Sequence, residues 1–354
     1  MRLNLLVALG IATAGAGAGA APAEPGPPGV AVFGAGMGGY SCFRIPALVA
    51  LGNGKLLAFA EARKLSCSDH GWVDLVVRSS SDSGRSWGGI QRVVSESREG
   101  ALVTDGNPAP VALRNGSVLL PYCRNNRQVF VVRSDDEGRT WTDPQNITDE
   151  STDPSWSWVA TGPPGSIELP NGDVVVPSDH RGPSSQGSHT LRLDRASGRW
   201  RLQQLLDQGN ECQAALLSNG STLLGMRPRS KTTGRLFALS DDGGATFHPP
   251  TNQPALRDPE CEGSLVAAPS GQLYLSNAAS STSRTNVTIH VSRDGAASWQ
   301  VLSSPWSGPS AYSSLAVMQA GAQNRSIGLL WEAWPNDGPK YAAIHFTIAT
   351  DTEH

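Results

Sequence analysis

The sequence predicts an all-β protein, a six-bladed β-propeller with Asp-box repeats, and three observations lead to this fold class. A hairpin pattern, two short apolar strands around a turn, recurs six times. A box of eight residues with Asp, Gly and an aromatic residue recurs four times, at multiples of about 53 residues. The 354 residues include 39 Gly and 25 Pro but only 17% charged residues, a composition typical of β-sheets joined by many turns.

The six hairpins are expected to form the first two strands of each blade. Five of them turn at a glycine, which tolerates positive φ, and Asn-Gly pairs such as Asn115-Gly116 are typical of tight hairpins. The sixth hairpin has a longer turn around Gly321. The hairpins span residues 46–59, 108–122, 164–177, 212–226, 263–276 and 312–331.

The box has the form Ser-x-Asp-x-Gly-x-Thr/Ser-Trp and is expected at the turn between the third and fourth strands of a blade. Asp and Ser side chains can bond the turn backbone, Gly supplies a positive φ, and the aromatic residue packs between sheets. We therefore interpret the boxes as structural. Copies occupy residues 80–87, 134–141, 240–247 with a final Phe, and 292–299 with Ala296 in place of Gly, and a degraded copy is expected around 194–200.

Strand direction predicts which polar residues share a face of the ring. Connected antiparallel strands run up and then down, so the starts of first strands, the ends of second strands and the loops to third strands lie together. Charged groups that crowd a central channel must pair or bind a ligand, so this face is the candidate site, with structural ion pairs as the alternative. The residues expected there are Arg44, Glu61, Asp69, Asn107, Arg124, His180, Glu211, Arg227, Glu262, Arg284, Tyr312 and Glu332.

Around these residues the chain resembles the exo-α-sialidase superfamily, and most of all the lysosomal-type animal sialidases and their bacterial relatives. The resemblance runs from about residue 40 to the C-terminus and implies one propeller domain over residues 24–354. The motifs that carry it are Phe43-Arg44-Ile45-Pro46, Glu61-Ala62-Arg63, Ser68-Asp69, Glu211-Cys212-Gln213, Arg284-x-Asn286-x-Thr288, Tyr312-Ser313-Ser314-Leu315 and Trp331-Glu332.

This resemblance implies a catalytic group made of Tyr312 as nucleophile, Glu211 as its base and Asp69 as the acid/base residue. A phenol fits the chemistry because sialic acid carries a carboxylate on its anomeric carbon, which would repel a carboxylate nucleophile. Tyr is normally protonated near neutral pH, so Glu211 must lie within hydrogen-bond distance, and neighbouring arginines are expected to favour the phenolate. Asp74 competes with Asp69 for the acid/base role.

The substrate-binding group implied by the resemblance is an arginine triad, since planar guanidinium groups match a carboxylate with paired hydrogen bonds. Its members are Arg44, Arg227 and Arg284, and Arg227 is preferred to Arg229 because of its distance from Glu211. Glu332 is expected to orient Arg44. Asn107 either lines the pocket or only turns the chain.

The function implied is a retaining exo-α-sialidase that hydrolyses terminal sialic acid from glycoproteins, glycolipids or oligosaccharides through a tyrosyl intermediate. Two alternatives remain open, a non-catalytic Asp-box propeller that binds glycans and a hydrolase that prefers the deaminated nonulosonic acid KDN. The expected partner is a sialylated glycan, and the chemistry requires neither a cofactor nor a metal. The net charge of −3 provides no basic footprint for nucleic acid.

Residues 1–23 predict a signal peptide, with Arg2 followed by a stretch of apolar and small residues and possible A-x-A cleavage sites. The localisation expected is the secretory pathway, ending outside the cell or in a lysosome-like compartment. No other stretch approaches the 18 apolar residues of a membrane span, so no stable membrane anchor is expected. The five cysteines leave at least one thiol free or paired between chains, and the sequence does not indicate an oligomeric state.

Overall fold

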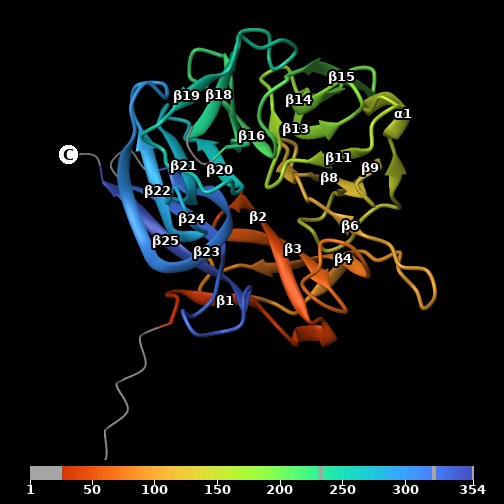
Figure 1. The fold of residues 1–354 in the computed structure, drawn as a ribbon, viewed down its shortest axis with the longest axis vertical. Helices are drawn as coiled ribbons and strands as arrows, with labels where there is room; N and C mark the ends of the chain where they lie inside the picture. Colours follow the sequence, from red (N-terminus) through yellow and green to blue (C-terminus); the bar gives the residue numbers. More distant parts are fainter. Residues whose placement is uncertain (1–25, 231–233, 321–323, 353–354) are drawn as a thin grey trace, which may run out of the picture.

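The computed structural model describes residues 26–230, 234–320 and 324–352, so the predicted signal peptide lies outside the described residues. The regular structure in these ranges is almost entirely β-strand, apart from one turn of 3-10 helix, η1 (Met37–Gly39), and one short helix, α1 (Thr148–Ser151). Figure 1 shows the sheets arranged in chain order around a centre. The predicted all-β, propeller-like architecture is confirmed.

Four of the sheets are antiparallel and built from consecutive strands. The first contains β2 (Cys42–Gly52), β3 (Lys55–Arg63), β4 (Val73–Ser80) and β5 (Gln91–Val94). The second contains β6 (Asp105–Gly106), β7 (Val111–Ala112), β8 (Val118–Arg124), β9 (Gln128–Ser134) and β10 (Gln145–Asn146). The third contains β11 (Trp158–Thr161), β12 (Ile167–Glu168), β13 (Val174–Arg181), β14 (Gln186–Asp194) and β15 (Arg199–Leu205). The fourth contains β16 (Cys212–Leu216), β17 (Thr222–Met226), β18 (Arg235–Ser240) and β19 (Thr251–Gln253).

The fifth sheet has seven strands and contains both ends of the described chain. Its long strand β23 pairs with β22 as far as Pro309 and with β24 from Ser310 onward. Strand β1 pairs with β25, so the first strand of the chain completes a sheet formed by the last ones (Figure 1). Its strands are β20 (Gly263–Ala267), β21 (Leu273–Ala278), β22 (Thr285–Ser292), β23 (Gln300–Ala320), β24 (Asn324–Ala333), β25 (Ala343–Thr352) and β1 (Val30–Gly34).

The core lies between neighbouring sheets, which explains the continuous apolar runs of the inner strands. On β3, Leu56 packs in a cluster with Phe346 of the fifth sheet, whereas Leu57 and Phe59 pack with Leu120 of the second. Successive side chains of a strand point to opposite faces, so a strand covered on both faces must be apolar at nearly every position. All six predicted hairpins are antiparallel strand pairs.

The Asp boxes form the turns between third and fourth strands, as predicted. In the second sheet, Ser134 Oγ donates a hydrogen bond to Asp136, and the backbone N–H and hydroxyl of Thr140 donate two more to the same carboxylate. The Trp141 ring then packs edge-on against Phe59 of the preceding sheet, with ring centroids 5.8 Å apart. The box therefore fixes its own turn and joins two sheets.

The other boxes repeat this arrangement. Trp87 packs on Phe346 at 5.4 Å, and Trp299 packs on Phe237 at 5.7 Å, in each case on a neighbouring sheet. Ala296, which replaces the usual glycine, adopts a φ of 76°. This is a conformation that glycine reaches without steric cost and alanine does not, so the box geometry is kept even where its sequence departs from the pattern.

No helix in the described parts of the chain is long and apolar enough to cross a lipid bilayer.

Candidate active site

Arg44 is positioned by an irregularity in β2. The pairing of β2 with β3 shifts between Arg44 and Ala47, and Ile45 adopts a φ of 57°. A β-branched residue rarely adopts this left-handed conformation, which costs about 1–3 kcal/mol. The turned backbone allows the Ile45 N–H to donate a 2.9 Å hydrogen bond to Glu332. The local strain is thus offset by a buried, charge-assisted bond beneath the Arg44 side chain.

Glu332, near the end of β24, accepts bonds from two strands and has no exposed surface. Arg44 donates to it twice, from Nε to Oε1 at 2.7 Å and from Nη2 to Oε2 at 3.1 Å. The backbone N–H of Tyr312 donates to Oε2 at 3.2 Å. One buried carboxylate therefore holds both the guanidinium of Arg44 and the backbone of the strand that carries Tyr312.

Tyr312 and Glu211 form a close pair at the centre of the site. The Tyr312 hydroxyl donates a 2.5 Å hydrogen bond to Glu211 Oε1. Arg227 Nη1 lies 2.5 Å from the other oxygen of Glu211 and 3.1 Å from the Tyr312 hydroxyl oxygen. Glu211 directly precedes β16, and Arg227 directly follows β17, so one hairpin presents both groups to the phenol.

The other two arginines of the predicted triad approach the ring of Tyr312. Arg44 Cζ lies 5.0 Å and Arg284 Cζ 5.4 Å from the Tyr312 ring centroid. Arg284 donates to the hydroxyl of Tyr341 at 3.3 Å and to the carbonyl of Glu260 at 3.4 Å. Among the contacts described for Arg284 none is an ion pair, so its charge is free to meet an incoming anion.

Tyr341 belongs to this site, and the sequence did not indicate it. The centroid of its ring lies 3.9 Å from Arg44 Cζ, and its hydroxyl accepts a hydrogen bond from Arg284. Tyr341 therefore contacts two of the three guanidinium groups of the triad. It lies in a loop of Pro, Asn, Asp and Gly between β24 and β25. No motif surrounds it. The only available signal was its position after the end of a second strand, on the predicted face.

The protonation state of Tyr312 is set by opposing effects, of which burial is the largest. Burial raises the pKa of the phenol well above its usual value, and the charge of Glu211 raises it further. Arg227 and Arg44 lower this pKa but do not outweigh those two effects. The neighbouring arginines therefore favour the phenolate, as expected, but burial and Glu211 together disfavour the charged form more strongly. Tyr312 rests as a neutral phenol bonded to a base.

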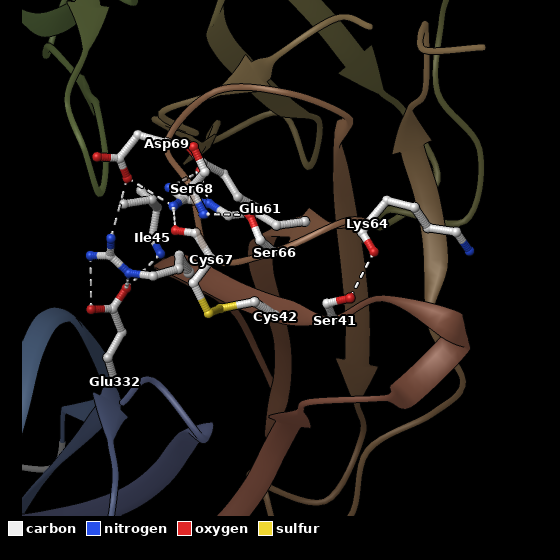
Figure 2. Close-up of a disulfide and its surroundings, with 12 residues drawn as sticks. Ser41, Cys42, Ile45, Glu61, Lys64, Ser66, Cys67, Ser68, Asp69 and Glu332 are labelled. Carbon is white, nitrogen blue, oxygen red and sulfur yellow. Dashed lines mark hydrogen bonds and ion pairs between the residues drawn. A yellow bond between two sulfur atoms is a disulfide. The ribbon is translucent and has the colours of Figure 1, made fainter. Parts of the chain in front are cut away.

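Asp69 lies in the loop between β3 and β4, and a disulfide fastens this loop to β2 (Figure 2). Cys67, two residues before Asp69, is bonded to Cys42, two residues before Arg44. Arg63 Nη1 donates to the Cys67 carbonyl at 2.6 Å and to Asp69 Oδ1 at 2.8 Å. Neither the pairing of these cysteines nor this role of Arg63 was predicted, because cysteines 25 residues apart share no spacing pattern.

Asp69 combines high exposure with strong electrostatic contacts. Its side chain is 70% exposed, and it lies 2.8 Å from Arg63 and 3.4 Å from Arg44. Partial burial raises the pKa of this carboxyl, but the charge and hydrogen bond of Arg63, with a contribution from Arg44, outweigh burial and leave the pKa below its usual value. Asp69 is therefore ionised in the empty site and faces solvent above the arginines.

The two competing residues lie elsewhere. Asp74 is buried and accepts a 2.6 Å hydrogen bond from Tyr40. Arg229 donates to the carbonyl of Gly209 at 2.7 Å. Of Arg227 and Arg229, Arg227 is the one that contacts Tyr312. Of Asp69 and Asp74, Asp69 is the one that contacts Arg44.

Asn107 contacts Glu61 and Cys123, and no contact described for it reaches an arginine of the triad. Its backbone N–H donates to Glu61 at 2.9 Å, and its Nδ2 lies 3.1 Å from the sulfur of Cys123. Glu61 in turn accepts bonds of 2.6 and 3.0 Å from Arg63. Asn107 thus supports Arg63 through Glu61, and its φ of 54° shows that it also turns the chain.

Asp179, at the end of β13, is a buried acid that our sequence analysis did not select. Burial, followed by the charge of Glu211, raises its pKa to about 7. Asn210 Nδ2 donates a 3.0 Å hydrogen bond to Asp179 Oδ2, and the other carboxylate oxygen, Oδ1, is buried without a hydrogen-bond partner among the described residues. The described residues contain no group of three or more His, Cys, Asp or Glu arranged to hold a metal ion.

Comparisons with known proteins agree on one family. A family model described as a BNR repeat-like domain matches residues 54–324. An exo-alpha-sialidase of Aspergillus fumigatus is 29% identical over 293 residues, covering 72% of this chain and 69% of that protein. A sialidase of Micromonospora viridifaciens is 30% identical over 350 residues, covering 89% of this chain and 53% of that protein. The solved structure of a Hadza microbial sialidase superimposes with a TM-score of 0.80 at 26% identity, covering 92% of this chain and 68% of that one.

Replacing Glu332 by Ala should destabilise the protein strongly. The change leaves the buried Arg44 guanidinium and two backbone N–H groups without their acceptor, which typically costs about 3–5 kcal/mol. Denaturant unfolding followed by tryptophan fluorescence measures this loss. Glu137→Ala removes a carboxylate from an exposed ion pair with Lys55 and should change the stability little. Equal stabilities of the two variants would contradict the claim that the buried Glu332 carboxylate holds Arg44 and the two backbone N–H groups in place.

Proposed function

The chain belongs to the BNR repeat-like family, within the sialidase superfamily of glycoside hydrolases, and from that premise we propose that it is a retaining exo-α-sialidase acting on terminal sialic acid of glycans. The observation that carries the proposal is the Tyr312–Glu211 pair, 2.5 Å apart, with three guanidinium groups around the phenol. A phenol bonded to a base serves nucleophilic attack, and the arginines serve a substrate that carries its own carboxylate.

The fold that supports this site is, in our proposal, a ring of six blades in one domain over residues 24–354. The seven-stranded sheet counts as two blades that share β23, because this strand pairs with β22 through one half and with β24 through the other. Four strands then belong to each of these two blades. The six antiparallel hairpins, one for each blade, support the same count.

Substrate binding is assigned to the arginine triad. The sialic acid carboxylate takes the place above Tyr312, where it meets Arg44, Arg227 and Arg284. Glu332 and Glu211 already pair with the first two arginines and fix their orientation. Arg284 contributes the charge that no described carboxylate balances, and it therefore supplies much of the attraction for the anion.

The first chemical step forms a bond between the Tyr312 oxygen and the anomeric carbon and breaks the glycosidic bond. The phenol proton passes to Glu211, which already accepts its hydrogen bond. Asp69, protonated in the complex, gives its proton to the departing glycosidic oxygen. Because Asp69 is ionised in the empty site, its pKa must rise on binding, and a substrate carboxylate that neutralises Arg44 acts in this direction.

The second step reverses the first with water in place of the alcohol. Asp69 takes a proton from water, the resulting oxygen attacks the anomeric carbon, and the bond to Tyr312 breaks. Glu211 returns its proton to the phenolate, so all groups regain their starting states. Two displacements at one carbon retain the anomeric configuration.

A glycan-binding propeller without catalysis is the alternative from another class. The Tyr312–Glu211 pair argues against it, since a carboxylate held 2.5 Å from a buried phenol has no use in simple binding. A preference for KDN is an alternative within the same chemistry, and it is decided by comparing the hydrolysis of aryl glycosides of KDN and N-acetylneuraminic acid. The described contacts favour neither of these two sugars.

The proposed location is the secretory pathway, reached through the signal peptide at residues 1–23. The Cys42–Cys67 disulfide supports it, because such bonds persist mainly in oxidising compartments. The other three cysteines, Cys123, Cys212 and Cys261, are buried free thiols. This agrees with the odd number of cysteines, which requires at least one to stay outside an intrachain disulfide.

Tyr312→Phe should lower kcat by about three orders of magnitude or more, because it removes only the nucleophilic oxygen. Fluorophore release from 4-methylumbelliferyl sialoside measures the rate, and calorimetry with sialic acid should show that binding persists. Tyr341→Phe is the matched control, since it removes the hydroxyl of the second tyrosine in the site and keeps its ring beneath Arg44. Unchanged turnover in Tyr312→Phe would remove this residue as the nucleophile.

Asp69→Asn should affect substrates according to their leaving groups. Loss of general acid catalysis should lower kcat/KM on sialyllactose by about 10²–10⁴-fold, because its sugar alkoxide leaves poorly without a proton. The value of kcat/KM for 4-methylumbelliferyl sialoside should fall much less, because its phenolate leaves unaided. Equal losses on both substrates would exclude Asp69 as the acid.

The disulfide should matter for the same step, because it ties the Asp69 loop to the Arg44 strand. A double variant, Cys42→Ser with Cys67→Ser, should lower kcat/KM on sialyllactose by about tenfold or more through a displaced acid, with a smaller loss on the aryl sialoside. Dithiothreitol, which gives two electrons and two protons to the disulfide, should affect the wild type in the same way and leave the double variant unchanged. Equal losses on the two substrates would mean that the disulfide stabilises the fold without positioning Asp69.

A further inference from the structure

A cavity outside the candidate site lies on the face of the ring where second strands end. It has a volume of about 710 Å³ and lies between the start of β9, the helix α1 and the start of β11. This volume is in the range of sites that bind small ligands, roughly 300–1,000 Å³. The residues that carry the following inference are Arg127, Asp149, Thr152, Asp153 and Trp158, all of which line the cavity.

Trp158 lines this cavity and contacts the loop that carries Asp69. It pairs with Arg181 at the end of β13, which places it on the face where second strands end. Its ring meets the ring of His70 at 6.3 Å, and His70 directly follows Asp69. A ligand that extends from Asp69 past His70 therefore reaches Trp158 and then the cavity.

The lining has the chemistry of a carbohydrate site. Trp158 is only partly buried, with the Arg181 guanidinium 6.0 Å from its ring centroid, and an indole ring packs well on the C–H face of a sugar. Asp149 and Asp153 offer carboxylates that accept hydrogen bonds from hydroxyls, and Arg127 and Thr152 offer donors. These two carboxylates are balanced by Arg127 in the lining and by Arg181 over the Trp158 ring. The described residues therefore give the cavity no excess of positive charge for a second sialic acid, and it suits a neutral sugar.

We propose that this cavity is a subsite for a neutral hexose or N-acetylhexosamine of the leaving glycan, beyond the sugar attached directly to sialic acid. The inference rests on the proposed function, because Asp69 marks where the leaving glycan begins. The first sugar of that glycan lies against Asp69 and His70, and a later one stacks on Trp158 and fills the space beside α1. The protein thus prefers sialic acid carried on an extended neutral oligosaccharide.

Filling the cavity tests the proposal. Asp149 is exposed on α1 and lies outside the catalytic group, so Asp149→Trp should occupy the cavity and leave the Tyr312 site intact. We expect kcat/KM on a sialylated lactosamine pentasaccharide to fall about tenfold, and kcat/KM on 4-methylumbelliferyl sialoside to stay unchanged. Asp143→Trp is the matched control, because Asp143 is equally exposed but belongs to the segment that follows an Asp box and does not line the cavity.

A binding measurement separates this proposal from the function itself. Saturation-transfer NMR with the neutral lactosamine tetrasaccharide, which has no sialic acid, should detect binding to the wild type and to Asp143→Trp but not to Asp149→Trp. If the wild type hydrolyses no sialoside but still binds the tetrasaccharide at this cavity, the proposed function fails and the subsite stands. Equal kcat/KM losses on both sialosides, no loss on either, or tetrasaccharide binding unaffected by Asp149→Trp would each overturn the subsite.

Discussion

A buried carboxylate without any exposed surface sets the geometry on which the site depends. Glu332 must satisfy its charge inside the protein, and it does so with the Arg44 guanidinium and the backbone N–H groups of Ile45 and Tyr312. These partners belong to β2 and β23, which lie at opposite ends of the chain. Assembly of the site and closure of the ring are consequently one event, and the strained φ of Ile45 persists because this carboxylate compensates it.

The empty site holds Tyr312 in the state from which the proposed first step begins, and Asp69 in the state opposite to the one that this step needs. Tyr312 is a neutral phenol because burial outweighs the arginines, and Asp69 is a carboxylate because Arg63 and Arg44 outweigh its partial burial. An anionic substrate changes the environment of Asp69, since it neutralises guanidinium charge beside this carboxyl and so raises its pKa. In the proposed mechanism the substrate itself therefore prepares Asp69 as the acid, which would limit reaction with uncharged sugars.

Sequence patterns predicted the parts of the molecule that local chemistry fixes. Alternating hairpins and Asp boxes determine strands and turns, and strand direction alone placed the residues of Tyr312, Glu211 and the triad on one face. The disulfide, Tyr341 and the contacts of Arg63 were not predicted, because they arise where loops without patterns meet in space. The sequence predicted the influence of the arginines on the Tyr312 phenol but not the dominance of burial, because the depth of burial depends on all the surrounding sheets at once.

The pairing of β1 with β25 has a consequence for biosynthesis. During synthesis, β1 emerges from the ribosome hundreds of residues before β25 does. Until then the backbone edge of β1 remains unpaired. Until the last strand arrives, the nascent chain is an open arc whose end sheets expose apolar flanks. Maturation of this molecule thus places its greatest demand on chaperones just before translation ends, and a product that stops short of β25 stays an unclosed intermediate.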